Sequence, residues 1–193
     1  MRLFILCISL CFSIAASANE RRVENYLNSI ESFSADFAQL DPDGNSAKGR
    51  FYLAKPGKFR WEYEDKPLLI VSNGELLTYF DEELNEVTYV NAKETLASIL
   101  ARDEIKFRDD IKLIEYSEKG AFIKTVLTQK GKQEEGSLAL YFRKDPMQIT
   151  MMEVIDQNGD VTKVFFDNQD FSAKIDEEKF IFRDPNFHKN AWE

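Results

Sequence analysis

The sequence predicts an α+β fold in which a curled antiparallel sheet of about eleven strands is accompanied by two helices. Strand-type segments recur roughly every ten residues and are separated by Gly, Asn and Asp turn signals, which is typical of hairpins and not of βαβ units. About eleven strands are too many for a small flat sheet, so the sheet should curl toward a barrel. Helical periodicity is confined to the residues before the first strand and to short interruptions between strands.

The first predicted helix covers residues 21–30, "RRVENYLNSI". Val23, Tyr26, Leu27 and Ile30 form one apolar stripe, and charged or polar residues occupy the other side, so this helix is amphipathic. The strand-type segments after it are 33–40, 49–54, 58–63, 68–72, 76–80, 86–90, 111–117, 121–129, 136–142, 149–155 and 161–167.

Two helical segments interrupt the strands. Residues 92–103, "AKETLASILARD", carry Leu96, Ile99 and Leu100 at helical spacing, and residues 176–180, "DEEKF", have the composition of a single turn. A helix placed between two strands of a curled sheet can cover the open side of that sheet.

The N-terminus has the pattern of a secretory signal peptide. A basic start, a short apolar run and Ala16-Ser17-Ala18 predict removal of residues 1–18, which leaves residues 19–193 as a single domain without linkers or repeats. The alternative is a lipoprotein signal acylated at Cys11, although Leu10 occupies a position where such signals have a small residue. Both cysteines of the chain precede the predicted cleavage point, so the mature domain has to rely on its core and not on disulfides.

The net charge argues against two classes of partner. Lys and Arg total 25 and Asp and Glu total 34, which gives a formal net charge of -9. Such a surface repels phosphate backbones and anionic membrane surfaces, so neither nucleic-acid binding nor permanent membrane binding is expected.

The residues that carry enzyme chemistry are scarce. His188 is the single histidine, and Cys7 and Cys11 lie in the predicted signal peptide, so a His/Cys metal site or a Cys-His nucleophile cannot be assembled. Nucleotide-binding and nucleophile-elbow motifs are absent. We therefore expect no enzyme, no cofactor and no metal; a secreted hydrolase with a carboxylate site remains the competing interpretation. The stretches "DPDGN" from Asp41 and "DQNGD" from Asp156 resemble calcium loops, but their glycine and acid spacing fits turns better.

One strand presents aromatic side chains on a single face. In "KPGKFRWEY", Phe59, Trp61 and Tyr63 alternate with Lys58, Arg60 and Glu62. The chain has 16 Phe, 7 Tyr and 2 Trp, more than a core of this size needs. These aromatic residues could be ordinary core or a surface that receives an apolar ligand.

A dense block of motifs surrounds that strand. The elements are Phe37-Ala38-Gln39, Gly49 to Leu53, Lys55-Pro56-Gly57, Phe59-Arg60-Trp61, Pro67, Asn73-Gly74 and Tyr79-Phe80-Asp81. In this order they resemble the periplasmic outer-membrane lipoprotein carrier family, LolA. The likeness runs from about Phe33 to Phe182, nearly the whole predicted mature chain.

The resemblance implies an incomplete β-barrel with a helical lid over an apolar cavity that holds acyl chains. It implies that the cavity is lined by Phe51, Leu53, Phe59, Trp61 and Tyr63. Leu96, Ile99 and Leu100 would close the lid. Lys55 occupies a position where many members have Arg. That Arg is thought to hold the lid closed by hydrogen bonds to backbone carbonyls of the lid, and Lys is a weaker, single-point donor.

The function implied is that of a periplasmic chaperone that carries lipoproteins from the inner to the outer membrane. Burial of each CH₂ group contributes about 0.8 kcal/mol, so multiply acylated proteins need a carrier to cross water. The implied partners are acylated lipoproteins, an inner-membrane lipoprotein-releasing ABC transporter and an outer-membrane lipoprotein receptor, with the carrier itself a monomer. The alternative is a lipid-sensing or lipid-binding regulatory domain on the same scaffold; the lack of a second domain favours the carrier.

Overall fold

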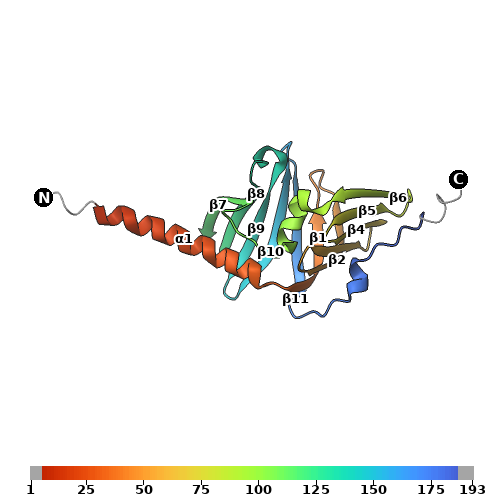
Figure 1. Ribbon diagram of the computed structural model, residues 1–193, viewed down its shortest axis with the longest axis horizontal. Coiled ribbons are helices and arrows are strands. Elements are labelled where there is room, and N and C mark those ends of the chain that lie inside the picture. The colour runs from red at the N-terminus through yellow and green to blue at the C-terminus, as the bar shows by residue number, and fades with distance from the viewer. Residues whose placement is uncertain (1–5, 187–193) are drawn as a thin grey trace.

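The computed structural model describes residues 6–186 and contains a single antiparallel sheet that curls around a helix and a short connection (Figure 1). The strands are β1 (Ser32–Leu40), β2 (Ser46–Ala54), β3 (Lys58–Tyr63), β4 (Leu68–Asn73), β5 (Leu76–Asp81), β6 (Glu86–Asn91), β7 (Ile111–Lys119), β8 (Phe122–Gln129), β9 (Gly136–Lys144), β10 (Met147–Asp156) and β11 (Val161–Asp170). The helices are α1 (Leu6–Ser29) and the 3-10 helices η1 (Ala92–Glu94), η2 (Leu96–Ala101), η3 (Gln133–Glu135) and η4 (Glu177–Phe180). The predicted fold class is confirmed.

The sheet is open. Its strand order is β6-β5-β4-β3-β2-β1-β11-β10-β9-β8-β7, and all neighbours are antiparallel. β1 pairs with β11, from Ser34 opposite Asp170 to Leu40 opposite Lys163, and so joins two halves that are each built from consecutive hairpins. β6 and β7 are the two edges and do not pair with each other, which confirms the predicted incomplete barrel.

β6 and β7 follow each other in the chain but lie at opposite edges, so the connection between them crosses the open side of the sheet. We call this connection, residues 92–110, the lid segment. Its helix η2 contacts β3 in one half of the sheet and β9 in the other. The lid segment therefore bridges the two halves (Figure 1).

The prediction of one continuous helix over residues 92–103 is wrong. Thr95 has an extended backbone, with φ −99° and ψ 144°, and separates η1 from η2. A 3-10 helix has three residues per turn, so Leu96 and Ile99 still share one face. The apolar spacing predicted a helix correctly but does not distinguish a 3-10 helix from an α-helix over one or two turns.

α1 is longer than the helix predicted over residues 21–30, because it begins at Leu6. No Gly or Pro occurs within α1, so no residue interrupts its hydrogen bonding. Its first part extends away from the sheet, and its last turns lie across the inner face (Figure 1). There Val23 is 0% and Leu27 is 1% exposed. Cleavage after Ala18, which would divide this helix, stays a prediction.

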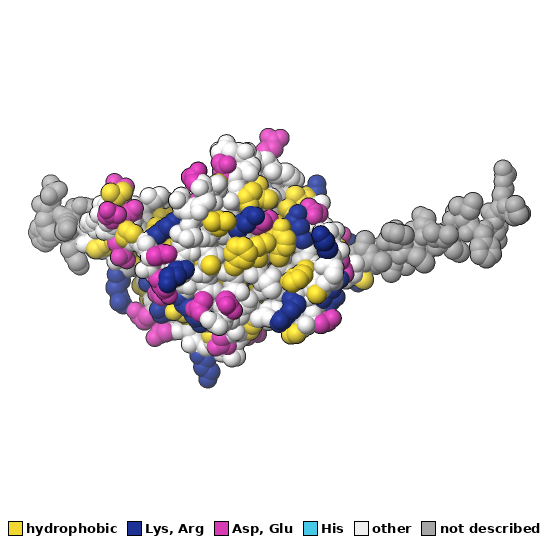
Figure 2. Space-filling view, turned by 180° about the vertical axis from the view of Figure 1, so that it is seen from behind, with side chains coloured by type: hydrophobic (Ala, Val, Ile, Leu, Met, Phe, Trp, Pro, Cys, Tyr) yellow, Lys and Arg dark blue, Asp and Glu magenta, His cyan; other side chains and the backbone are white. Residues whose placement is uncertain are grey.

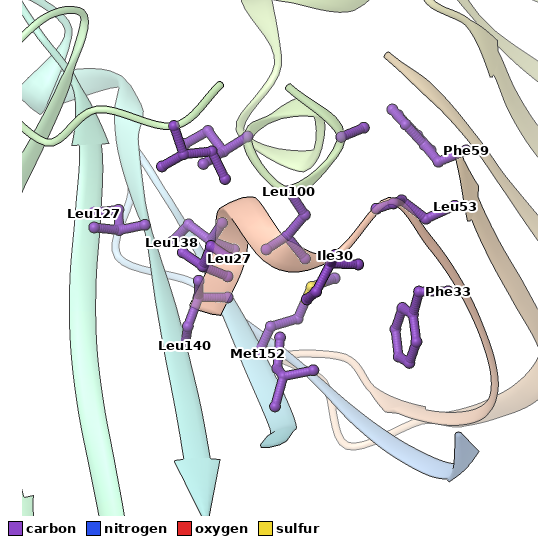
Figure 3. Packing of buried hydrophobic residues seen from close by; sticks show 14 of the residues in the cluster. Leu27, Ile30, Phe33, Leu53, Phe59, Leu100, Leu127, Leu138, Leu140 and Met152 are labelled. Carbon is purple, nitrogen blue, oxygen red and sulfur yellow. The ribbon is translucent and has the colours of Figure 1, made fainter. Parts of the chain in front are cut away.

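The hydrophobic core fills the space between the inner face of the sheet and its cover of α1 and η2. Figure 3 shows Leu27 of α1 and Leu100 of η2 between side chains of the two sheet halves. Those side chains include Leu138 and Leu140 of β9, Leu53 of β2 and Phe59 of β3. The apolar face of the sheet is thus covered by elements that are not part of the sheet.

The segment after β11 covers part of the opposite, outer face. Its helix η4, predicted as a single turn, contacts β3 and β4, and Phe180 is buried there. Lys179 Nζ lies 2.9 Å from Oε1 of Glu62 on β3. Burial favours a higher pKa for Glu62, but hydrogen bonds from Lys179 and Arg60 outweigh it and lower this pKa. The outer face of this half is therefore closed by the chain itself.

Gly49 allows β1, β2 and β3 to pack tightly at one point. It pairs with Phe37 on one side and Tyr63 on the other, and the rings of Phe37 and Tyr63 meet edge-on above it at 5.1 Å. A Cβ atom at Gly49 would collide with the carbonyl oxygen of Glu62 and approach the Phe37 ring to 2.9 Å. A side chain at this position would displace either the strand or the aromatic pair.

We predict that Gly49→Ala lowers the free energy of unfolding by about 1 to 3 kcal/mol, because the added methyl group overpacks a rigid strand pair. Ser46→Ala, at an exposed position of the same strand, is the matched control and should change stability by less than about 0.5 kcal/mol. Urea unfolding of both variants measures the difference. Equal midpoints for the two variants would contradict this account of Gly49.

Candidate functional site

The aromatic residues singled out in the sequence lie together on the inner face. Strand register places Phe51 opposite Trp61 and Leu53 opposite Phe59, so the four side chains point the same way. Their exposed fractions are 2%, 6%, 2% and 1% in that order, whereas Tyr63 is half-buried. The Phe51 and Trp61 rings lie 4.2 Å apart between centroids.

This aromatic layer is packed and is not the wall of an open cavity. Phe166 of β11 joins it, with its ring 5.6 Å from Phe51 and 6.1 Å from Trp61. Side chains of α1 and η2 belong to the same core cluster and pack over this inner face (Figure 3). The physical reason is that an apolar surface of this size gains free energy when the nearest apolar helices close over it.

The three residues expected to form the lid belong to η2 and contact the core. Ile99 is 0% and Leu100 is 8% exposed, and both belong to the core cluster, while Leu96 packs against it half-buried. The backbone also holds the lid segment, because the Gly57 N–H donates to the Ala101 carbonyl at 2.5 Å. The turn between β2 and β3 therefore fixes the end of η2.

Lys55, expected to bond to a lid carbonyl, makes its side-chain hydrogen bond to α1. Its Nζ donates instead to the carbonyl of Leu27 in the last turn of α1, at 2.9 Å. Burial lowers the pKa of Lys55, and the charge of Asp103 opposes that shift. Carbonyls in the last turn of a helix carry partial negative charge and attract a cation. Lys55 thus ties α1, and not η2, to the sheet.

Gln129, which sequence reasoning missed, makes the contacts expected of Lys55. Its side-chain Nε2 lies 3.3 Å from the carbonyl oxygen of Lys93 and 3.4 Å from that of Thr95, both in the lid segment. The residue is 8% exposed at the end of β8. A signal was present, because Gln129 has the same strand parity as Ile123 and Leu127 and should therefore face inward.

The lid segment is also tied to α1. The Asn28 side chain donates to the Ile105 carbonyl at 2.9 Å and accepts from the Ile105 N–H at 2.8 Å, in the manner of a backbone bridge. Glu24 accepts from the Phe107 N–H at 3.2 Å. These bonds make α1 and the lid segment one connected cover.

A separate bond links α1 to the sheet. The hydroxyl of Tyr26 accepts from the Ile149 N–H at 2.9 Å, beside an irregularity in the pairing of β10 with β9. Burial raises the pKa of Tyr26, and this backbone hydrogen bond opposes the shift. The Tyr26 ring also meets the Phe142 ring edge-on at 5.6 Å.

Two of the pockets that border the lid segment are lined in part by η2. The larger, of about 620 Å³, is lined by residues such as Asn73, Lys93 and Arg102, which forms an ion pair with Asp110. The smaller, of about 250 Å³, brings together Tyr79 of β5, Leu96 of η2, Gln129 of β8 and Val154 of β10. The smaller pocket therefore lies between the two halves of the sheet, next to the lid segment.

The remaining candidates for chemistry stay apart. Asp41 and Asp156 lie in hairpin turns, as predicted, with Gly159 at φ 87°. Within residues 6–186, no group of three or more His, Cys, Asp or Glu side chains is placed to hold a metal ion. His188 lies outside the described residues. In the same described part of the chain, no helix has both the length and the hydrophobicity of a membrane span.

We predict that Asn28→Ala uncouples the lid segment from α1. Removing both bonds to Ile105 should increase hydrogen exchange at the Ile105 amide by the equivalent of about 1 to 3 kcal/mol, while the central strands stay protected. Ser29→Ala is the control, because its hydroxyl bonds only within α1, to the Tyr26 carbonyl. Unchanged exchange at Ile105 would refute the coupling.

Curated relatives cover nearly the whole chain. The chain is 29% identical over 211 residues to an outer-membrane lipoprotein carrier protein of Methylococcus capsulatus, with 95% of this chain and 94% of that protein covered. It is 30% identical over 198 residues to a protein of the same name from Pseudomonas aeruginosa, with 95% and 93% covered.

A solved structure supports the fold alone. An uncharacterized conserved protein of Thermus thermophilus matches with a TM-score of 0.53 at 14% identity, over 89% of this chain and 96% of that one. The family model described as outer membrane lipoprotein carrier protein LolA matches residues 28–183, which include β1 to β11 and the lid segment. The chain therefore belongs to the LolA family of outer membrane lipoprotein carrier proteins.

Proposed function

We propose that this protein is a periplasmic carrier that encloses the acyl chains of lipoproteins and moves them from the inner to the outer membrane. The observation that carries the proposal is the apolar inner face. α1 and the lid segment cover this face, and a small number of polar bonds hold them in place. Membership in the carrier family supports it. An inner-membrane ABC transporter would supply the cargo, and an outer-membrane receptor would accept it.

Loading replaces one set of apolar contacts by another. Displacing the cover takes Leu27, Ile99 and Leu100 off the sheet, at a cost of about 1.5 to 3 kcal/mol for each side chain that becomes exposed. Each buried CH₂ group of the cargo returns about 0.8 kcal/mol, so one long acyl chain outweighs these losses. The exchange makes loading favourable. When cargo leaves, the cover can pack on the inner face again, so loading can be reversed.

The residue roles follow from this exchange. After the cover moves, the acyl chains would contact Phe51, Leu53, Phe59, Trp61 and Tyr63, and the smaller pocket beside Leu96 would be the place where the halves first separate. Lys55 would hold α1 in the closed state, and Gln129 would hold the lid segment. Residues 1–18 would be removed on export, so that residues 19–193 form the carrier.

The negative net charge, carried on a surface where acidic and basic side chains are interspersed (Figure 2), suits a carrier that has to leave membranes. The chain has a formal net charge of -9, and the charge repels anionic bilayer surfaces at both ends of the route. Affinity for cargo then resides in the covered inner face and not on the outside.

We predict that Gln129→Leu opens the lid segment more often. The two amide hydrogen bonds to Lys93 and Thr95 are long, so their loss should cost about 1 kcal/mol and raise amide exchange over η2 about fivefold. The same variant should take up a fluorescent apolar probe faster. Lys130→Ala, at the exposed neighbouring position, is the control. If η2 exchanges as slowly in Gln129→Leu as in the control, Gln129 does not hold the lid.

The proposed function is tested by purifying the protein from periplasm and identifying what accompanies it by mass spectrometry. We expect triacylated lipoproteins, and we expect purified complexes to release them to outer-membrane vesicles that contain the receptor. Lipid that is bound but never transferred would favour a lipid-sensing domain. If no acylated species accompanies the protein, although the transporter is present and holds cargo, the carrier function is rejected.

A further inference from the structure

Thr125, in the middle of β8, has a side chain that the fold leaves unsatisfied. It is 0% exposed, and its Oγ1 has no hydrogen-bond partner within residues 6–186. No other buried side-chain nitrogen or oxygen in that described part of the chain is in this position. A buried hydroxyl without a partner loses its hydrogen bonds to water and gains none, so it calls for an explanation.

The unsatisfied hydroxyl faces the proposed ligand space. Thr125 has the same strand parity as Ile123 and Leu127, which belong to the core cluster of the inner face. It pairs with Leu140 of β9 and Tyr116 of β7, which also contribute to that cluster. Its side chain therefore points toward the cover and away from the outer surface.

The cover over this part of the sheet is α1. Figure 3 shows Leu27 beside Leu138 and Leu140 of β9, the strand next to β8. The contact between the Tyr26 and Phe142 rings lies on the same strand. In the proposed loading step, the Thr125 hydroxyl would border the space that α1 vacates.

A threonine three residues further along β8 behaves differently. Thr128 is also 0% exposed, but its parity is opposite and its Oγ1 donates to the Gly136 carbonyl at 3.1 Å. Thr128 thus serves the fold, whereas valine would fill the place of Thr125 with the same shape and no unpaired polar atom. In the closed structure the Thr125 hydroxyl has no hydrogen-bond partner among the described residues.

We propose that Thr125 is a ligand-selecting residue, whose hydroxyl donates a hydrogen bond to an ester carbonyl oxygen of an acylglyceryl group. This inference rests on the proposed carrier function and adds a polar recognition element to its apolar site. An ester carbonyl is a neutral acceptor flanked by hydrocarbon, which fits one donor among Leu140, Ile123 and Leu127. A charged phosphate or carboxylate would lose its hydration there without a cation to compensate.

The test compares two probes with the full-length mature protein. One is a synthetic cysteinyl peptide with a dipalmitoylglyceryl group, and the other is the same peptide with two hexadecyl ether chains, which lack the carbonyl oxygens. The parent protein should bind the ester probe more tightly. Thr125→Val should weaken ester binding by about three- to tenfold and leave ether binding unchanged.

Stability separates this role from a structural one. Thr125→Val should not lower the urea midpoint, because it removes an unpaired polar atom, whereas Thr128→Val should lower it by breaking the bond to Gly136. The inference is overturned if Thr125→Val destabilises the protein as Thr128→Val does, or if its ester and ether affinities change equally. A parent protein that binds neither probe would instead reject the carrier function, and this inference with it.

Discussion

The structure depends on one constraint: an eleven-stranded sheet that does not close leaves one large apolar face to be covered. A closed barrel would bury that face against itself. Here β6 and β7 do not pair with each other, and the side chains on the inner face of the sheet pack against α1 and η2 instead. Because β6 and β7 are consecutive in the chain, their connection necessarily crosses the open side. The position of the lid segment is thus a consequence of the strand order.

The cover is held by side chains that donate to, or accept from, backbone groups at helix ends. Lys55 reaches the Leu27 carbonyl at the end of α1, Gln129 reaches two carbonyls around η1, and Asn28 pairs with Ile105. Helix ends and irregular segments leave carbonyls unpaired, which makes them natural partners for such donors. Water can replace each of these bonds when the cover moves, so the ties position the cover without making it permanent.

The two faces of the sheet differ in how their polar groups are paired. On the outer face, Lys179 and Arg60 converge on Glu62, and η4 buries Phe180 against β3 and β4, so polar and apolar groups are both satisfied. On the inner face the cover is apolar, and the Thr125 hydroxyl is left without a partner. Unpaired groups are costly in a folded core, and their presence on the inner face fits a surface that serves a second occupant.

Much of the fold could be predicted from local pattern. Alternation along each strand and Gly or Asn turns between strands were sufficient for eleven strands in the right order along the chain, because both signals act within a few residues. The alternation in "KFRWEY" also placed Phe59 and Trp61 on one face, and the spacing of Leu96 and Ile99 predicted a helical turn that faces the core.

The tertiary structure alone decided how the site is closed. Apolar spacing did not distinguish a 3-10 helix from an α-helix at η2, and the partner of Lys55 lies in α1, nearly thirty residues earlier in the chain. The contacts of Gln129 span more than thirty residues, so no local periodicity reports them. The sequence by itself determined the strands, the turns and the apolar face. Contacts distant in sequence, whose strength depends on how elements pack, decided that side chains of α1 and η2 fill the space above that face.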